Sequence, residues 1–162
     1  MLDGWRSLEH VRPDGAFDSV QSVLIAAPVV EATADAASSL GERYWRQVRR
    51  ASHGLVRWRE HDGRVELRLL SAGPPLLRFT PTRVSTGPGE VGCSYAIDGG
   101  LLARRPGGAI SFTQTDGDPA ELSVAVEGYF PRLGVLLGPL QRRFHVHVSR
   151  RYFRAWLREA RR

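Results

Sequence analysis

Residues 55–70 read LVRWREHDGRVELRLL, two short runs separated by Asp62-Gly63. In the second run apolar and charged residues alternate, as in Val65-Glu66-Leu67, which is the period-two pattern of a half-buried strand. Asp-Gly between two such runs favours the left-handed backbone of a tight two-residue hairpin turn. The stretch therefore predicts two antiparallel strands, over residues 55–60 and 64–70.

The period-two pattern continues on the C-terminal side, with glycine or proline in the turns between runs. Further strands are predicted at residues 76–84, 91–97, 101–104, 110–113 and 121–130. On the N-terminal side we expect a short first strand at 20–27, after an irregular lead-in at 1–18. Short links make neighbouring strands pair antiparallel, so the sequence predicts a curved meander of about six to seven strands.

Two regions have helical periodicity. Between Pro28 and Ala51 the sequence is rich in alanine, and Gly41 predicts a break into two short helices. From about Leu136 onward, apolar residues follow one helical stripe (Leu137, Leu140, Phe144, Val148, Tyr152, Ala155) and a second one (Val146, Phe153, Leu157). We therefore expect a single α+β domain over residues 1–162, in which the sheet grips a long C-terminal helix.

The positive charge is concentrated in that last helix. The formal net charge is +6, and the sequence has no lysine, so all 23 basic side chains are arginines. Residues 1–140 contain 15 arginines and 16 Asp or Glu, whereas residues 141–162 contain eight arginines and only Glu159. The arginine-only pattern is typical of biased codon usage, which disfavours nucleic acid as a partner. The absence of lysine excludes a Schiff-base or P-loop lysine.

The remaining composition predicts a cytoplasmic protein. No apolar run approaches the roughly 20 residues that span a bilayer, and the stretch at 23–30 lacks the basic start of a secretory signal. Peripheral contact with an anionic membrane remains one alternative. The single Cys93 excludes an intramolecular disulfide and a cysteine zinc site.

Three short motifs imitate known sites, but each lies in the wrong context. Residues 87–92 read GPGEVG, but a strand follows where a dinucleotide site needs a helix. Ser94 in GCSYA resembles a nucleophile elbow, yet it lies within an antiparallel strand. His145 and His147 point in different directions on a helix and cannot share a metal ion. The sequence predicts no catalytic motif and no cofactor.

Three segments carry a resemblance to a known superfamily. Residues 95–102 (YAIDGGLL), 127–133 (EGYFPRL) and 141–145 (QRRFH) resemble motifs of uncharacterised actinobacterial members of the START-like superfamily, also called SRPBCC or Bet v 1-like. The order of elements over about residues 20–160 is similar to the helix-grip fold of that superfamily. The resemblance implies an apolar cavity between sheet and C-terminal helix, used by relatives for lipids, sterols and polyketide intermediates. It transfers no catalytic role.

We therefore expect a module that binds a hydrophobic or amphipathic small molecule between sheet and helix. Alternation places Cys93 and Tyr95 on one strand face, where the Tyr95 hydroxyl is a candidate ligand contact. The full set of candidate ligand-binding residues is Phe79, Cys93, Tyr95, Phe112, Phe144 and Tyr152. The same side chains are equally interpreted as ordinary core residues.

Two alternatives remain open. The first is a cyclase- or dehydratase-like enzyme in the same cavity, with Tyr95 or a pocket Asp or His as acid or base. The second is a surface for anions or acidic partners on the C-terminal helix, formed by Arg143, Arg150 and Arg154. An arginine stripe of this kind is also typical of a solvated helix face.

Overall fold

The computed structural model describes residues 4–70, 72–132 and 138–160. Within these residues all eight strands belong to one antiparallel sheet, in the order β1-β2-β8-β7-β6-β5-β4-β3. The predicted α+β class, with an antiparallel sheet and a long C-terminal helix, is confirmed, although the sheet has more strands than expected. The elements are β1 (Arg6–Val11), β2 (Phe17–Ile25), α1 (Ala34–Ala51), β3 (Val56–His61), β4 (Arg64–Leu69), β5 (Leu77–Ser85), β6 (Glu90–Gly99), β7 (Ala109–Thr115), β8 (Ala120–Tyr129) and α2 (Gly138–Glu159).

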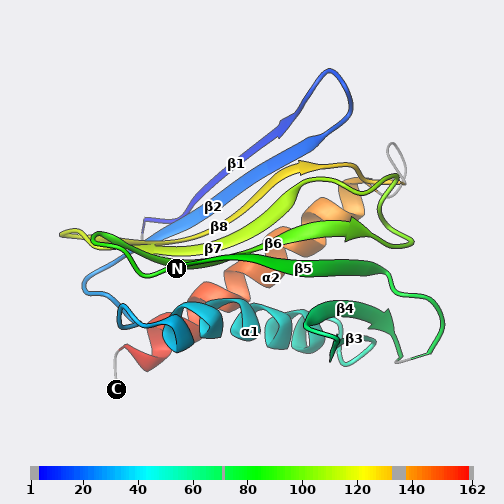
Figure 1. The fold of residues 1–162 in the computed structure, drawn as a ribbon. Helices are drawn as coiled ribbons and strands as arrows, with labels where there is room; N and C mark the ends of the chain where they lie inside the picture. The colour runs from blue at the N-terminus through cyan, green and yellow to red at the C-terminus, as the bar shows by residue number, and fades with distance from the viewer. Residues whose placement is uncertain (1–3, 71, 133–137, 161–162) are drawn as a thin grey trace.

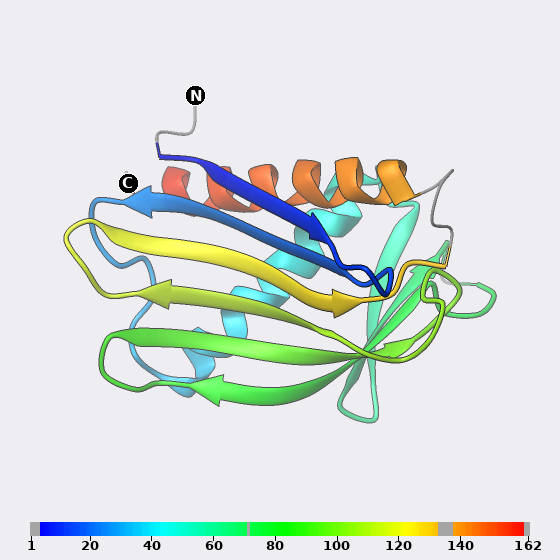
Figure 2. The same cartoon turned by 90° about the horizontal axis from the view of Figure 1, so that it is seen from above.

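Both helices lie on the same face of the sheet (Figure 1). Seen from above, α1 runs diagonally beneath the central strands, and α2 lies along the β1 side of the sheet (Figure 2). The opposite face carries small polar side chains that bond across strands, with Ser94 Oγ 2.9 Å from Ser111 Oγ and Thr113 Oγ1 2.6 Å from Ser123 Oγ. The hydrophobic core therefore lies between the sheet and the two helices.

The hairpin that the sequence predicts at Asp62-Gly63 is confirmed. Asp62 and Gly63 have φ of 50° and 71°, the left-handed backbone that a tight hairpin turn requires. In contrast, residues 101–104 form turns, and only Ala103 pairs, in an isolated bridge with Pro131. The prediction of a strand there is wrong. The chain instead turns at Gly100, where a Cβ would lie 2.4 Å from the Leu76 carbonyl oxygen.

The N-terminal residues are more ordered than the sequence predicts. Residues 6–11, expected to be irregular, form β1 and pair with β2 from Arg6↔Ser22 to Val11↔Phe17. The expected first strand is β2, which begins three residues earlier than predicted. All six side chains of β1 are exposed. Because neither face of β1 is buried, its sequence has no alternating pattern to identify it.

Helix α1 is one continuous helix, so the predicted break at Gly41 is wrong. It begins after the N-cap Thr33, whose hydroxyl accepts the Ala36 N–H. A Cβ at position 41 would lie 2.7 Å from the Tyr95 hydroxyl oxygen on β6. The glycine therefore allows close packing of α1 against the sheet.

The connection between β2 and α1 is held by one buried side chain. Gln114 on β7 is fully buried, and its Oε1 accepts the N–H groups of Val29 and Val30 at 2.7 and 3.0 Å. Its Nε2 donates to the Val30 carbonyl at 2.8 Å. These bonds replace the helical turn that the sequence predicts after Pro28, and they fix where α1 starts.

Helix α2 turns part of the expected apolar stripes inward. Its buried residues are Gly138, Val148, Ser149, Tyr152, Phe153 and Trp156, of which Val148, Tyr152 and Phe153 belong to the predicted stripes. Leu140, expected in the apolar stripe, is 62% exposed, and Leu137 lies outside the described residues. Neither α1 nor α2, over its described length, is apolar enough to cross a bilayer. The buried face thus overlaps the predicted stripes and also includes the polar side chains of Ser149 and Trp156.

Candidate functional site

The predicted ligand-binding residues do come together, but in a packed cluster. Phe79, Cys93, Tyr95, Phe112 and Tyr152 are all buried in the main core. Phe144 is only half-buried and packs at the edge of that core. Whether these residues bind a ligand stays a prediction, because the structure shows them packed against one another.

Helix α1 provides the aromatic rings that fill the predicted cavity. Trp45 packs on Phe79 with ring centroids 4.8 Å apart, and at 5.7 Å on Phe112. Tyr44 lies 5.0 Å from Phe112 and 5.7 Å from Tyr152, which belongs to α2. The two helices and the sheet therefore meet in one aromatic cluster.

Beside this cluster, the inward face of α2 carries a line of five polar side chains. Its members are spaced four, four, three and four residues apart, so they fall within roughly a quarter of the helix circumference. We call them the polar line: Gln141, His145, Ser149, Tyr152 and Trp156. Each has a buried polar atom that makes no hydrogen bond with any described residue, namely Gln141 Oε1, His145 Nε2, Ser149 Oγ, Tyr152 OH and Trp156 Nε1.

Neighbouring polar groups lie close to this line without bonding geometry. Burial raises the pKa of Tyr44 and of Tyr152, and the nearby side chains of Ser149 and Trp156, respectively, lower them by a smaller amount. Ser149 Oγ and Trp156 Nε1 thus lie close to these hydroxyls, although neither pair meets the geometry of a hydrogen bond. Unpaired polar atoms at this depth cost about 1–3 kcal/mol each. In native proteins such atoms usually find a partner in protein or ordered water. The polar line therefore has hydrogen-bonding capacity that no described residue uses.

His145 is the member of the line with acid–base chemistry. Its Nδ1 lies 2.7 Å from the Tyr44 hydroxyl oxygen. Burial lowers the pKa of His145 to about 4, so the ring is neutral at neutral pH. A neutral imidazole has one donor and one acceptor nitrogen. Nδ1 is hydrogen-bonded to the Tyr44 hydroxyl, so Nε2 is the ring nitrogen that has no hydrogen-bond partner among the described residues.

The other buried groups in this region are also uncharged. Burial raises the pKa of Tyr44, Tyr95 and Tyr152 well above that of free tyrosine. Burial likewise raises the pKa of the Cys93 thiol, so it is a poor nucleophile. Tyr95 is thus a hydrogen-bond donor rather than a base, and these buried side chains are neutral at neutral pH.

The predicted anion surface is only partly assembled. Arg143 and Arg150 line a pocket of about 560 Å³ between β1 and α2, together with Arg142, His147 and Glu9. Arg154 is exposed but does not line that pocket. His145 is buried and His147 is exposed, so the two histidines do point in different directions. An anion-binding role of these arginines stays a prediction.

Sequence reasoning missed most of the polar line. It selected Tyr152 as a cavity residue, considered His145 as a metal ligand, and placed Gln141 and His145 within the segment that resembles the START-like superfamily. The signal that identifies the line is the repeat of polar or amphipathic residues at helical spacing from Gln141 to Trp156. Hydrophobic periodicity does not detect the polar line, because it assigns the buried face of a helix from apolar residues such as Leu140 and Phe144 and not from glutamine or serine.

No protein-family profile and no curated protein sequence matches this chain. The chain is similar to two solved structures of CalU16 from Micromonospora echinospora, each with 13% sequence identity and a TM-score of 0.40. The crystal structure aligns over 94% of both chains, and the solution NMR structure over 91% of this chain and 74% of that one. A likeness at this level carries no argument about function. The resemblance to the START-like superfamily stays a prediction.

Proposed function

We propose that this protein binds an amphipathic small molecule between the polar line of α2, helix α1 and the helix-covered face of the sheet. The observation that supports this proposal is the row of five buried, unpaired polar atoms along one face of α2. Folding alone gains nothing from burying such groups without partners. A ligand that bonds to them recovers that free energy on binding.

The chemistry of the polar line suggests the class of ligand. Gln141 Oε1 accepts hydrogen bonds, the Trp156 N–H donates them, and the hydroxyls of Ser149 and Tyr152 do both. Beside these atoms lie the apolar rings of the aromatic cluster, such as Phe112 and Trp45. The site thus suits a neutral molecule with an apolar skeleton and several hydroxyl or carbonyl groups, of a lipid- or polyketide-like kind.

Binding requires movement of the packed side chains. Ring centroids in the aromatic cluster lie about 5–6 Å apart, so a ligand must displace rings or shift α2 away from the sheet. A ligand stabilises such an open state only through contacts that the closed state lacks. The unpaired atoms of the polar line are contacts of this kind.

Native mass spectrometry of the purified protein, followed by solvent extraction, tests this proposal. We expect one apolar small molecule bound per protein molecule, or a higher unfolding temperature when lipid- or polyketide-like compounds are added. The triple variant Gln141→Leu/Ser149→Ala/Tyr152→Phe should lose both and keep its helix and strand content by circular dichroism. Ser94→Ala, on the opposite face of the sheet, is the matched control and should retain binding. The proposal is contradicted if the wild-type protein has no bound small molecule and if no added compound raises its unfolding temperature.

A second candidate is an enzyme that uses the same site. The observation in its favour is the 2.7 Å contact between the Tyr44 hydroxyl and His145 Nδ1, which orients a neutral imidazole toward the interior. Such a ring is a general base when its Nε2 is the acceptor. Incubation of the identified ligand with the protein distinguishes the two functions. A binder returns it unchanged, whereas an enzyme converts it, and Tyr44→Phe should slow that conversion.

A further inference from the structure

Three exposed leucines lie together at one end of the β3–β4 hairpin, away from the polar line. Leu55, Leu69 and Leu70 are exposed by 51%, 50% and 57%. The Leu70 N–H donates to the Leu55 carbonyl at 2.7 Å, and Leu69 pairs with Val56 across the strands. We call these three residues the leucine end of the hairpin. Together they form a local apolar projection on the described surface.

The backbone of Leu70 makes this projection more unusual. Its φ is 51°, in the left-handed region where glycine or asparagine is common and a bulky side chain is disfavoured. Strained positions of this kind persist where the surrounding structure enforces them, and they cluster at functional sites. Here the strained residue exposes its apolar side chain to solvent, which does not stabilise the fold.

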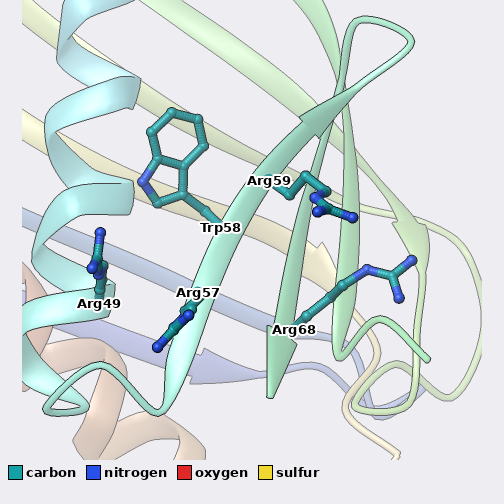
Figure 3. Close-up of a pocket in the computed structure, with 5 residues that line it drawn as sticks. All are labelled: Arg49, Arg57, Trp58, Arg59 and Arg68. Atoms are coloured by element: carbon teal, nitrogen blue, oxygen red, sulfur yellow. The ribbon is translucent and has the colours of Figure 1, made fainter. Parts of the chain in front are cut away.

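Next to the leucine end is an arginine-lined pocket of about 260 Å³ (Figure 3). Arg57 and Arg68 are cross-strand partners one residue pair from Leu69, and Arg49 reaches the pocket from the last turn of α1. Arg59 and the half-buried Trp58 complete the lining. Figure 3 shows the guanidinium groups spread around β3, with the Trp58 ring directed toward α1. Apolar and cationic groups thus share one end of the molecule.

Arginines outnumber carboxylates at this end: four arginines line the pocket, and the acidic residues of β3 and β4 are Glu60 and Glu66. Residues 43–59 and 67–89 contain no Asp or Glu. Glu66 lies on the neighbouring strand, and its carboxylate is bonded to Arg68 at 2.7 Å. A surface that combines clustered arginines with exposed leucines and a tryptophan matches the chemistry of a membrane interface.

We propose that the leucine end and the arginine pocket beside it dock on a bilayer containing anionic lipids. The leucines enter the boundary between headgroups and acyl chains, and the arginines bind lipid phosphates through their guanidinium N–H groups. A free phosphate would engage the arginines but would not use the leucines. The membrane is therefore the partner that uses both features.

Cosedimentation with vesicles tests the docking surface. The protein should bind vesicles of phosphatidylcholine with added phosphatidylglycerol and not vesicles of phosphatidylcholine alone, and added salt should weaken binding. Arg49→Glu/Arg57→Glu should reduce the binding constant at least about tenfold, because each cation near an anionic surface contributes to attraction. Leu69→Ser/Leu70→Asn should reduce it comparably, and Asn tolerates the left-handed backbone at position 70.

Matched controls separate this surface from the rest of the molecule. Leu8→Ser removes a leucine that is 71% exposed on β1, and it should leave vesicle binding unchanged. Arg150→Glu/Arg154→Glu reverses the same number of charges on α2 and should have a smaller effect. Loss of binding only in the α2 variant would overturn the proposal and assign the contact to α2. It is also overturned by an unchanged affinity in the leucine variant, because a contact that involves the arginines alone would not need the leucines.

Discussion

Gln114 and the polar line of α2 both place polar atoms in the interior. The Gln114 amide is hydrogen-bonded, whereas five buried atoms of the polar line are not. The Gln114 amide makes three bonds to the backbone of Val29 and Val30. The five buried atoms of the polar line make none with the described residues. Gln114, Ser149, Tyr152 and Trp156 are all buried, so depth of burial alone does not explain the difference. The comparison teaches that a fully bonded buried group stabilises the fold, whereas a row of unbonded ones leaves hydrogen-bonding capacity unused, which is the basis of the proposed binding function.

The largest effect is expected when the bonded group is removed. Gln114→Leu leaves two N–H groups and one carbonyl without their partner, so we expect a loss of about 3 kcal/mol in the free energy of unfolding. Urea denaturation measures it. Gln21→Leu is the matched control, because Gln21 is equally buried but its Oε1 has no partner in the structure. Equal losses for the two variants would show that the hydrogen bonds of Gln114 to Val29 and Val30 do not account for its contribution to stability.

A smaller effect should appear in the pH dependence of stability. His145 has a pKa of about 4 in the folded protein and about 6.5 when unfolded. The unfolded state therefore takes up a proton first as the pH falls, so the free energy of unfolding decreases between pH 6.5 and 4, by at most about 3 kcal/mol. Denaturation at a series of pH values checks this. His145→Leu should flatten the curve in that range, whereas His147→Ala, at an exposed position, should not.

The smallest effect is expected within the polar line itself. Ser149→Ala removes a buried hydroxyl that has no partner. The desolvation cost that this relieves opposes the lost packing of Oγ, so the free energy of unfolding of the ligand-free protein should change by no more than about 0.5 kcal/mol. Ser52→Ala is the matched comparison, because the Ser52 hydroxyl accepts the Val56 N–H at 2.9 Å and donates to the Arg49 carbonyl. That variant should cost about 1 kcal/mol. If Ser149→Ala costs as much in thermal or urea unfolding, Ser149 has a partner in the free protein.

The elements that sequence predicts well are those whose pattern follows from burial on one face. Strands β4 and β6 alternate between core and surface, so their positions follow from hydrophobic periodicity. Strand β1 lies at an edge with both faces exposed, and nothing in its composition marks it as a strand. Gly41 is typical of a helix break, but it lies within α1 because Tyr95 leaves no room for a side chain. A contact with the distant β6 decided the case of Gly41, whereas β1 is held by pairing with the neighbouring β2.

The candidate site was less predictable than the fold, for the same reason. Tyr95 and Phe112 were identified because apolar alternation places them on the inward face of the sheet. Ser149 and Trp156 were missed because the direction of α2 depends on how it packs against α1. Gln114 has no sequence signal either, since its partners lie 84 and 85 residues away in a loop. Polar residues reveal their role only when their neighbours are known.

The two ends of the sheet have a consequence for how copies of this protein meet in solution. β1 and β3 are edge strands, and each presents a row of backbone groups that no described strand pairs. Such edges can recruit a strand from a second copy and begin aggregation, and charged side chains oppose this. β3 carries Arg57, Arg59 and Glu60, and β1 carries Arg6 and Glu9. Charged side chains at both edges therefore oppose edge-to-edge pairing, and replacing the β3 arginines with apolar β-branched residues should promote it.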